Sequence, residues 1–134
     1  MPIAFEIDHA AQRVMVTATG DIRIEDMAAL VNRLAELRVL SYSQRFDARG
    51  AAVVMSAEQM RRIVPLIGRL REEHGPARTA FIADSDVSFG MARMYATLSA
   101  DTDSGFMVYR KIEEGDAWLG WQRQESEQIG RAHV

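Results

Sequence analysis

The chain has 134 residues, 48% of them hydrophobic and 26% charged, which is the composition of one globular domain. Its net charge of −3 argues against a nucleic-acid partner, because phosphate binding needs clustered cationic surface. The absence of cysteine excludes disulfides and thiolate catalysis, so we expect a cytoplasmic location, and no apolar run is long enough for insertion into a membrane.

Two segments of alternating polarity open the chain, over residues 3–7 and 14–18. Alternation of this kind is typical of strands with one buried face. The connection between them, residues 8–12, is too short for the helical crossover that parallel neighbours would need. The two segments are therefore predicted to pair as an antiparallel hairpin.

A helix, a strand and a second helix are predicted next. Apolar residues recur with a helical period from residue 24 to residue 34, and a third strand is predicted over residues 44–48, broken at Gly50. The apolar residues 51–55 are either an extension of this strand or a loop packed on the core. The stretch Ser56-Ala57-Glu58-Gln59 has the form of a capping box, with Ser56 as the N-cap of the second helix. Pro65 falls inside that helix, so we expect a kink there or two shorter helices.

A buried strand over residues 79–83 is joined to a third helix with almost no loop, as in α/β folds. Four side chains of that helix are expected to face the sheet: Phe89, Ala92, Tyr95, Leu98. Four others are left toward the surface: Ser88, Met91, Arg93, Met94. Gly90 is expected to be small so that the helix can lie close to the sheet.

A fifth strand over residues 106–110 and a short helix over residues 112–119 complete the predicted domain. The element order is ββαβαβαβα, which predicts an α/β fold. Its five-stranded mixed sheet would be antiparallel at the N-terminal hairpin and otherwise parallel, with covering helices. The domain is expected to span residues 1–120, followed by a polar C-terminal tail over residues 121–134.

Four local patterns accompany this order: strand ends at Asp8 and at Thr19-Gly20, the segment Phe46-Asp47-Ala48-Arg49, the junction from Asp84 to Tyr95, and the closing Ala117-Trp118-Leu119-Gly120. With these patterns the chain resembles the SpoIIAA-like branch of the STAS fold, the fold of sulphate transporter and anti-sigma-factor antagonist domains. The resemblance is to a branch with many members that are small stand-alone bacterial proteins of unassigned function. The resemblance implies a STAS-like single domain that acts as a non-enzymatic regulatory or protein-interaction module.

Ser56 stands where anti-sigma antagonists carry a phosphorylatable serine in an Asp-Ser-Ser-like motif. Here the stretch is Val54-Met55-Ser56-Ala57, without the preceding aspartate. The resemblance makes Ser56 a candidate phospho-site, whereas the capping box indicates a structural N-cap. A phosphate at a helix N-terminus would be favoured electrostatically, so both roles stay open.

Acidic residues follow the third and fourth predicted strands: Asp47, Asp84, Asp86. Together they could hold a cation of the magnesium type, or serve an enzyme. The alternative is structural, with Asp47 paired to Arg45 or Arg49, and with one of the three residues Asp84, Ser85 and Asp86 capping the third helix. We adopt the structural alternative and predict no catalytic residue, no metal and no cofactor.

The outward face of the third helix, with Met91, Arg93 and Met94, is the candidate partner surface; the alternative is that Met91 and Met94 complete the core under a neighbouring helix. Met repacks readily and Arg supplies hydrogen bonds, so this face suits a protein partner or self-association as a homodimer. Residues at the strand ends are further candidate contacts: Asp47, Arg49, Asp84, Ser85, Asp86. The alternative function is that of a carrier, which would bind a small apolar or anionic ligand between the sheet and the helices.

Overall fold

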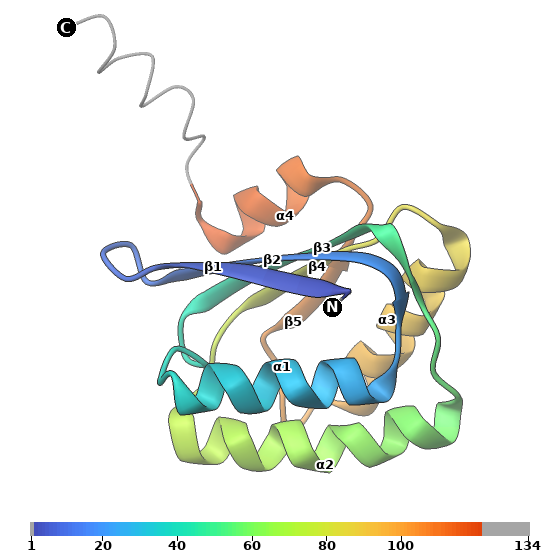
Figure 1. The fold of residues 1–134 in the computed structure, drawn as a ribbon, viewed down its shortest axis with the longest axis horizontal. Helices are drawn as coiled ribbons and strands as arrows, with labels where there is room; N and C mark the ends of the chain where they lie inside the picture. The colour runs from blue at the N-terminus through green and yellow to red at the C-terminus, as the bar shows by residue number, and fades with distance from the viewer. Residues whose placement is uncertain (1, 122–134) are drawn as a thin grey trace, which may run out of the picture.

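The strands of the sheet lie side by side in the order in which the chain makes them. The computed structural model describes residues 2–121 and contains one five-stranded sheet with the order β1-β2-β3-β4-β5 (Figure 1). The strands are β1 (Ile3–Asp8), β2 (Arg13–Ile22), β3 (Ser43–Val53), β4 (Thr79–Ile82) and β5 (Phe106–Tyr109). β1 and β2 pair antiparallel, and every other pair is parallel. The predicted hairpin and mixed sheet are confirmed.

The helices cover both faces of this sheet. They are α1 (Ile24–Glu36), α2 (Ala57–His74), α3 (Asp86–Leu98) and α4 (Ile112–Leu119). From β2 to β5 each new parallel strand is added on the same side of the strand before it. Because the connections between parallel strands are right-handed, the helices in them then lie on one face of the sheet. α1, α2 and α3 accordingly share a face, and α4 covers the opposite one (Figure 1).

Alternation along the strands divides the core into two layers. Val14 and Val16 of β2 point into the larger cluster, under α1 to α3, whereas Met15 between them packs in the smaller cluster under α4. β4 is buried at every position because both of its faces are covered. Burial on both faces explains why the sequence of β4 does not alternate between apolar and polar residues.

Two elements differ from their predicted bounds. Gly50 was expected to break the third strand, but β3 continues through it to Val53 and pairs with β2 up to Ile22, after a register shift between Thr17 and Thr19, so residues 51–53 form the strand extension and not a loop. The extended β2 supplies the partner that keeps β3 in the sheet beyond the glycine. α2 is one continuous helix across Pro65, so the alternative of two shorter helices is wrong. Pro65 is exposed, so solvent can satisfy the carbonyl that loses its N–H partner.

The buried stripe of α3 is displaced from the predicted one. Ser88, Ala92 and Tyr95 are buried, whereas Leu98 is 38% exposed, so the expectation that Leu98 faces the sheet is wrong. The expectation that Ser88 points toward the surface is also wrong. Ser88 is buried, and its Oγ accepts a hydrogen bond of 3.2 Å from the backbone N–H of Val53. A small hydroxyl residue fits there because α3 begins directly against the end of β3.

The close approach of a helix to the sheet occurs at a different glycine from the predicted one. A Cβ at Gly90 would meet nothing within 4 Å, so this glycine does not let α3 approach the sheet. At Gly115 of α4 a Cβ would lie 2.6 Å from Ile82 Cδ1 and 3.2 Å from Ala80 Cβ. Gly115 therefore sets the distance between α4 and β4.

Trp121 ends the described chain and is buried against the α4 face of the sheet. Its Nε1 donates a 2.9 Å hydrogen bond to Ser43 Oγ, and the guanidinium carbons of Arg13 and Arg45 lie 4.9 and 5.3 Å from its ring centroid. The rest of the predicted polar tail, residues 122–134, lies outside the described residues. Within residues 2–121 no helix combines the length and hydropathy of a membrane span.

Candidate functional site

The strand-end acids are engaged in separate local contacts. Arg49 donates to both oxygens of Asp47, from Nε and Nη2, at 2.9 Å each, and its backbone N–H adds a third hydrogen bond of 3.1 Å. The hydrogen bonds from Arg49 hold the pKa of Asp47 below its usual value, against the opposing effect of burial. Arg45, the other predicted partner, instead forms an ion pair of 3.0 Å with Asp116 of α4.

At the end of β4, Ser85 caps α3, whereas Asp84 and Asp86 both contact Arg110. Ser85 is the N-cap of α3, since its Oγ accepts a 3.2 Å hydrogen bond from the Ser88 N–H. Asp86 forms an exposed ion pair of 2.8 Å with Arg110, which also donates to the backbone oxygen of Asp84 at 3.4 Å. Among residues 2–121 no group of three or more His, Cys, Asp or Glu side chains could hold a metal ion.

The topology explains why these acids do not share a crevice. Ligands of open α/β sheets bind at strand ends where the strand order reverses and the helices change face. The strand order of this sheet never reverses from β1 to β5. The space that the fold creates lies instead between the sheet and helices α1 to α3.

A surface hollow of about 360 Å³ lies where α2 and α3 begin. Its lining includes Val54, Met55, Ser56, Val87 and Met91. Val87 is 72% exposed and Val54 38% exposed, which makes them two of the most exposed large apolar residues among those described. Sequence reasoning proposed neither residue as a contact, although an apolar residue between Asp86 and Ser88, in the first turn of a helix, is a local signal.

Ser56 lies at this hollow and forms the predicted capping box. Its Oγ accepts a 3.1 Å hydrogen bond from the Gln59 N–H, and Gln59 Oε1 accepts one of 3.0 Å from the Ser56 N–H. Two backbone donors at the start of α2 are satisfied in this way. The N-cap role of Ser56 is therefore confirmed, and the residue is exposed.

The three candidate residues on α3 have different surroundings. Met91 is partly buried and lines the hollow. Arg93 is exposed, with its guanidinium carbon 5.9 Å from the centroid of the Phe89 ring. Met94 is partly buried and packs against the larger core cluster. Of the three, Met91 is the one that shapes the hollow.

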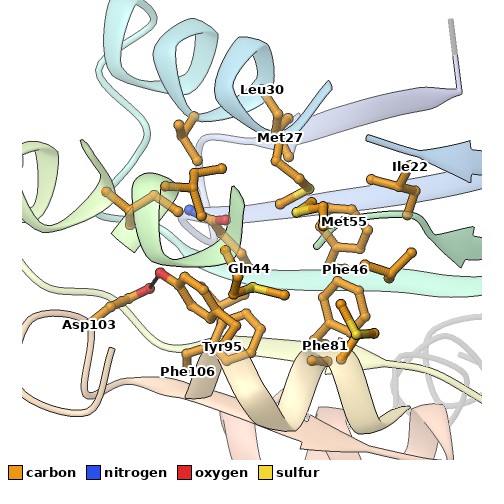
Figure 2. A pocket seen from close by; sticks show the side chains of 18 residues that line it. Ile22, Met27, Leu30, Gln44, Phe46, Met55, Phe81, Tyr95, Asp103 and Phe106 are labelled. Carbon is orange, nitrogen blue, oxygen red and sulfur yellow. Dashed lines mark hydrogen bonds between the residues drawn. The ribbon is translucent and has the colours of Figure 1, made fainter. Parts of the chain in front are cut away.

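A cavity of about 70 Å³ lies inside the larger core cluster, between the sheet and the helices. Eighteen residues line it, and fourteen of these are apolar, four of them methionines: Met27, Met55, Met60, Met91. The polar exceptions are Gln44, Thr79, Tyr95 and Asp103. Figure 2 shows Tyr95 and Asp103 at one end of the cavity and Ile22 and Met55 at the other.

A buried hydrogen-bond network closes the polar end. Asp103 accepts from Arg71 Nε at 3.1 Å and from the Tyr95 hydroxyl at 2.8 Å. Arg71 Nη1 also donates to the backbone oxygen of Leu40 at 2.6 Å, and Nη2 lies 3.4 Å from Thr79 Oγ1. Burial, reinforced by the charge of Asp103, raises the pKa of Tyr95 well above its usual value of 10.0, so the phenol stays neutral and donates. Sequence reasoning assigned no role to Asp103 and missed this one.

Comparisons with known proteins concern the fold. No model of a known family matches the chain, and no curated protein does. An uncharacterized DUF3478-family protein with a SpoIIAA-like fold, from Shewanella loihica PV-4, aligns over 87% of this chain and 93% of its own, with 16% identity and a TM-score of 0.57. The fold is SpoIIAA-like.

Two further SpoIIAA-like structures align at 14% identity and a TM-score of 0.52. One is the anti-sigma factor antagonist SpoIIAA in its unphosphorylated form, matched over 87% of this chain and 97% of its own. The other is an anti-sigma factor antagonist from Mycobacterium paratuberculosis, matched over 88% of this chain and 94% of its own. At this identity the likeness establishes the architecture, and function has to be argued from the site.

Proposed function

We propose that this protein is a regulatory protein-interaction module whose partner binds at the hollow where α2 and α3 begin. The observation that carries the proposal is the exposure of Val87 and Val54 beside a concave, methionine-lined surface. Apolar side chains at the rim of a hollow are typical of protein contacts, because an inserted apolar residue removes both surfaces from water. Two structural neighbours are named anti-sigma factor antagonists, a name that denotes action on another protein.

The partner expected here presents an apolar anchor residue. Complete burial of a valine side chain contributes about 1.5–3 kcal/mol. Because Val87 is 72% exposed in the free protein, most of this free energy can still be gained when a partner covers it. A charge placed at Val87 would have to be buried unpaired in the complex, so it should weaken binding by at least about tenfold.

Ser56 gives the surface a candidate means of regulation. Its hydroxyl is exposed at the hollow and lies at the N-terminus of α2. A phosphoryl group there would be stabilised by the helix dipole and could still accept the Gln59 N–H. It would also add negative charge beside Val87 and Met91, and so oppose an apolar anchor.

Site-specific crosslinking can identify the partner and locate its contact. A photo-reactive p-benzoylphenylalanine replaces Val87 in one variant and Leu98, at the far end of α3, in the control. We expect a partner crosslinked from position 87 and not from position 98. Val87→Asp should then weaken binding of the purified partner about tenfold or more, whereas Leu98→Lys should not; each charge suits its end of the helix dipole, so both helices should form.

Equal crosslinking from both positions, or an unchanged affinity in Val87→Asp, would contradict the proposal. Sedimentation of the protein alone separates self-association from a foreign partner. If the partner is a second copy of the chain, wild type should sediment as a dimer and Val87→Asp as a monomer.

A further inference from the structure

We propose that the core cavity is a binding site for a small neutral molecule with an apolar body and one hydroxyl group, of which phenol is the simplest example. The cavity lies between the sheet and helices α1 to α3, away from the strand-end acids. This inference does not depend on the proposed protein partner. It develops the carrier alternative by assigning the residues and the ligand class.

The lining can adapt to a guest. The cavity of about 70 Å³ exceeds the share of liquid volume that one water takes, roughly 30 Å³, and is about half of an engineered cavity, on the order of 150 Å³, that binds benzene. Met27, Met55, Met60 and Met91 all line it. Their unbranched side chains have three rotatable bonds each, so they can change rotamer and enlarge the space without moving the backbone.

The polar end can hold one hydroxyl group. Gln44 Nε2 donates to the Leu40 backbone oxygen at 3.1 Å, while none of the residues in the described part of the chain donates to Gln44 Oε1. That oxygen is an available acceptor in a lining that is otherwise mostly apolar. The Tyr95 oxygen, whose proton goes to Asp103 at 2.8 Å, has lone pairs left to accept as well.

The charges at this end favour a neutral guest. Arg71 already pairs with Asp103 at 3.1 Å, and both side chains are buried. An anionic guest would be repelled by the Asp103 carboxylate. A cationic guest would have no free acceptor there, because the carboxylate already accepts from Arg71 and Tyr95. A charged group left unpaired in such a place is strongly disfavoured. Of the two ligand classes first considered, the lining therefore selects the apolar one.

An entry route for the guest is suggested by residues that the cavity and the hollow share. Val53, Met55 and Met91 line both the internal cavity and the surface hollow. All three are only partly buried. Rotation of the two methionine side chains would connect the hollow to the cavity, without unfolding either helix.

Methionine methyl NMR tests the proposal in the intact protein. The four cavity methionines should shift saturably on titration with phenol, while Met15, on the opposite face of the sheet, and Met107, exposed on β5, should not. Benzoate, which has a similar shape and a negative charge, should give no saturable shift. Shifts that do not saturate, or that include Met15 and Met107 equally, would mean that the cavity is only packing space and would overturn the proposal.

Two variants assign the contact. Ala92→Leu fills the cavity and should weaken phenol binding about tenfold or more, whereas Ala29→Leu, at an exposed position of α1, should change it less than about twofold. Gln44→Leu should weaken phenol about tenfold and leave toluene unchanged, because only phenol donates to Gln44. Wild-type affinity in a folded Ala92→Leu overturns the site. If that variant does not fold, equal losses for phenol and toluene in Gln44→Leu overturn it.

Discussion

Removal of the Asp103 carboxylate should leave the Arg71 guanidinium buried without its charge partner. The two side chains are 4% and 8% exposed, so water cannot replace the lost partner. Asp103→Ala also removes the acceptor of the Tyr95 hydroxyl, now 2.8 Å from the carboxylate. The variant therefore creates one unpaired charge and one unpaired hydroxyl in the same buried place.

The size of the effect follows from these contacts. Removing one partner of a buried ion pair costs about 3–5 kcal/mol, and the unpaired hydroxyl adds about 1 kcal/mol. Arg71 keeps its 2.6 Å hydrogen bond to the Leu40 oxygen, which favours the lower half of that range. We expect a loss of about 4–5 kcal/mol, a large part of the roughly 5–15 kcal/mol that stabilises a typical domain.

Urea unfolding, followed by circular dichroism, measures the loss. Asp101→Ala, an exposed position in the same turn, is the matched control and should stay within about 0.5 kcal/mol of wild type. The double variant Arg71→Met/Asp103→Ala should be more stable than Asp103→Ala alone, because it removes the uncompensated charge. A loss below about 1 kcal/mol in Asp103→Ala, or a double variant less stable than the single one, would refute the reasoning.

Three further predictions can be checked by the same unfolding assay. Ser56→Ala should lower the free energy of unfolding by about 1 kcal/mol and Ser56→Asp should be nearly neutral, since Asp also caps; equal losses would contradict the capping role. Gly115→Ala should cost about 1–3 kcal/mol through its contact with Ile82, whereas Gly90→Ala, where the space is open, should gain about 0.5–1 kcal/mol. Because the pKa of Tyr95 is raised in the folded state, its contribution is complete below pH 10.0 and is lost as the pH rises above that value. Tyr95→Phe should lack this alkaline loss, and an unchanged pH profile in the variant would show that Tyr95 is not its cause.

Local signals in the sequence predicted much of the fold. The short connection after residue 8 forces an antiparallel hairpin, and the Ser56 capping box marks the start of α2; both depend on residues close together in the chain. The faces of α3 were predicted less well. Ser88 is buried because its hydroxyl meets the Val53 N–H, and that contact depends on how far β3 extends. The sequence of residues 86–98 alone therefore does not predict that Ser88 is buried.

The candidate site shows the same division. Ser56 and Met91 were found because caps and helical faces are local patterns. The cavity was not assigned to residues, because its polar lining comes from β3, β4, α3 and the turn before β5. Asp103 looks like an ordinary turn residue until the fold brings Arg71 within 3.1 Å of it, and a contact across 32 positions leaves no periodic trace in one sequence.

The agreement between strand order and chain order also affects how the molecule can form. Each strand from β2 to β5 adds beside the strand made immediately before it, so none has to wait for a partner that is synthesised later. Each parallel step closes a loop no longer than one crossover, which keeps the entropy of closure modest. The sheet can therefore grow by addition at a single edge as the chain leaves the ribosome, and the only unpaired edge that moves during growth is that of the newest strand.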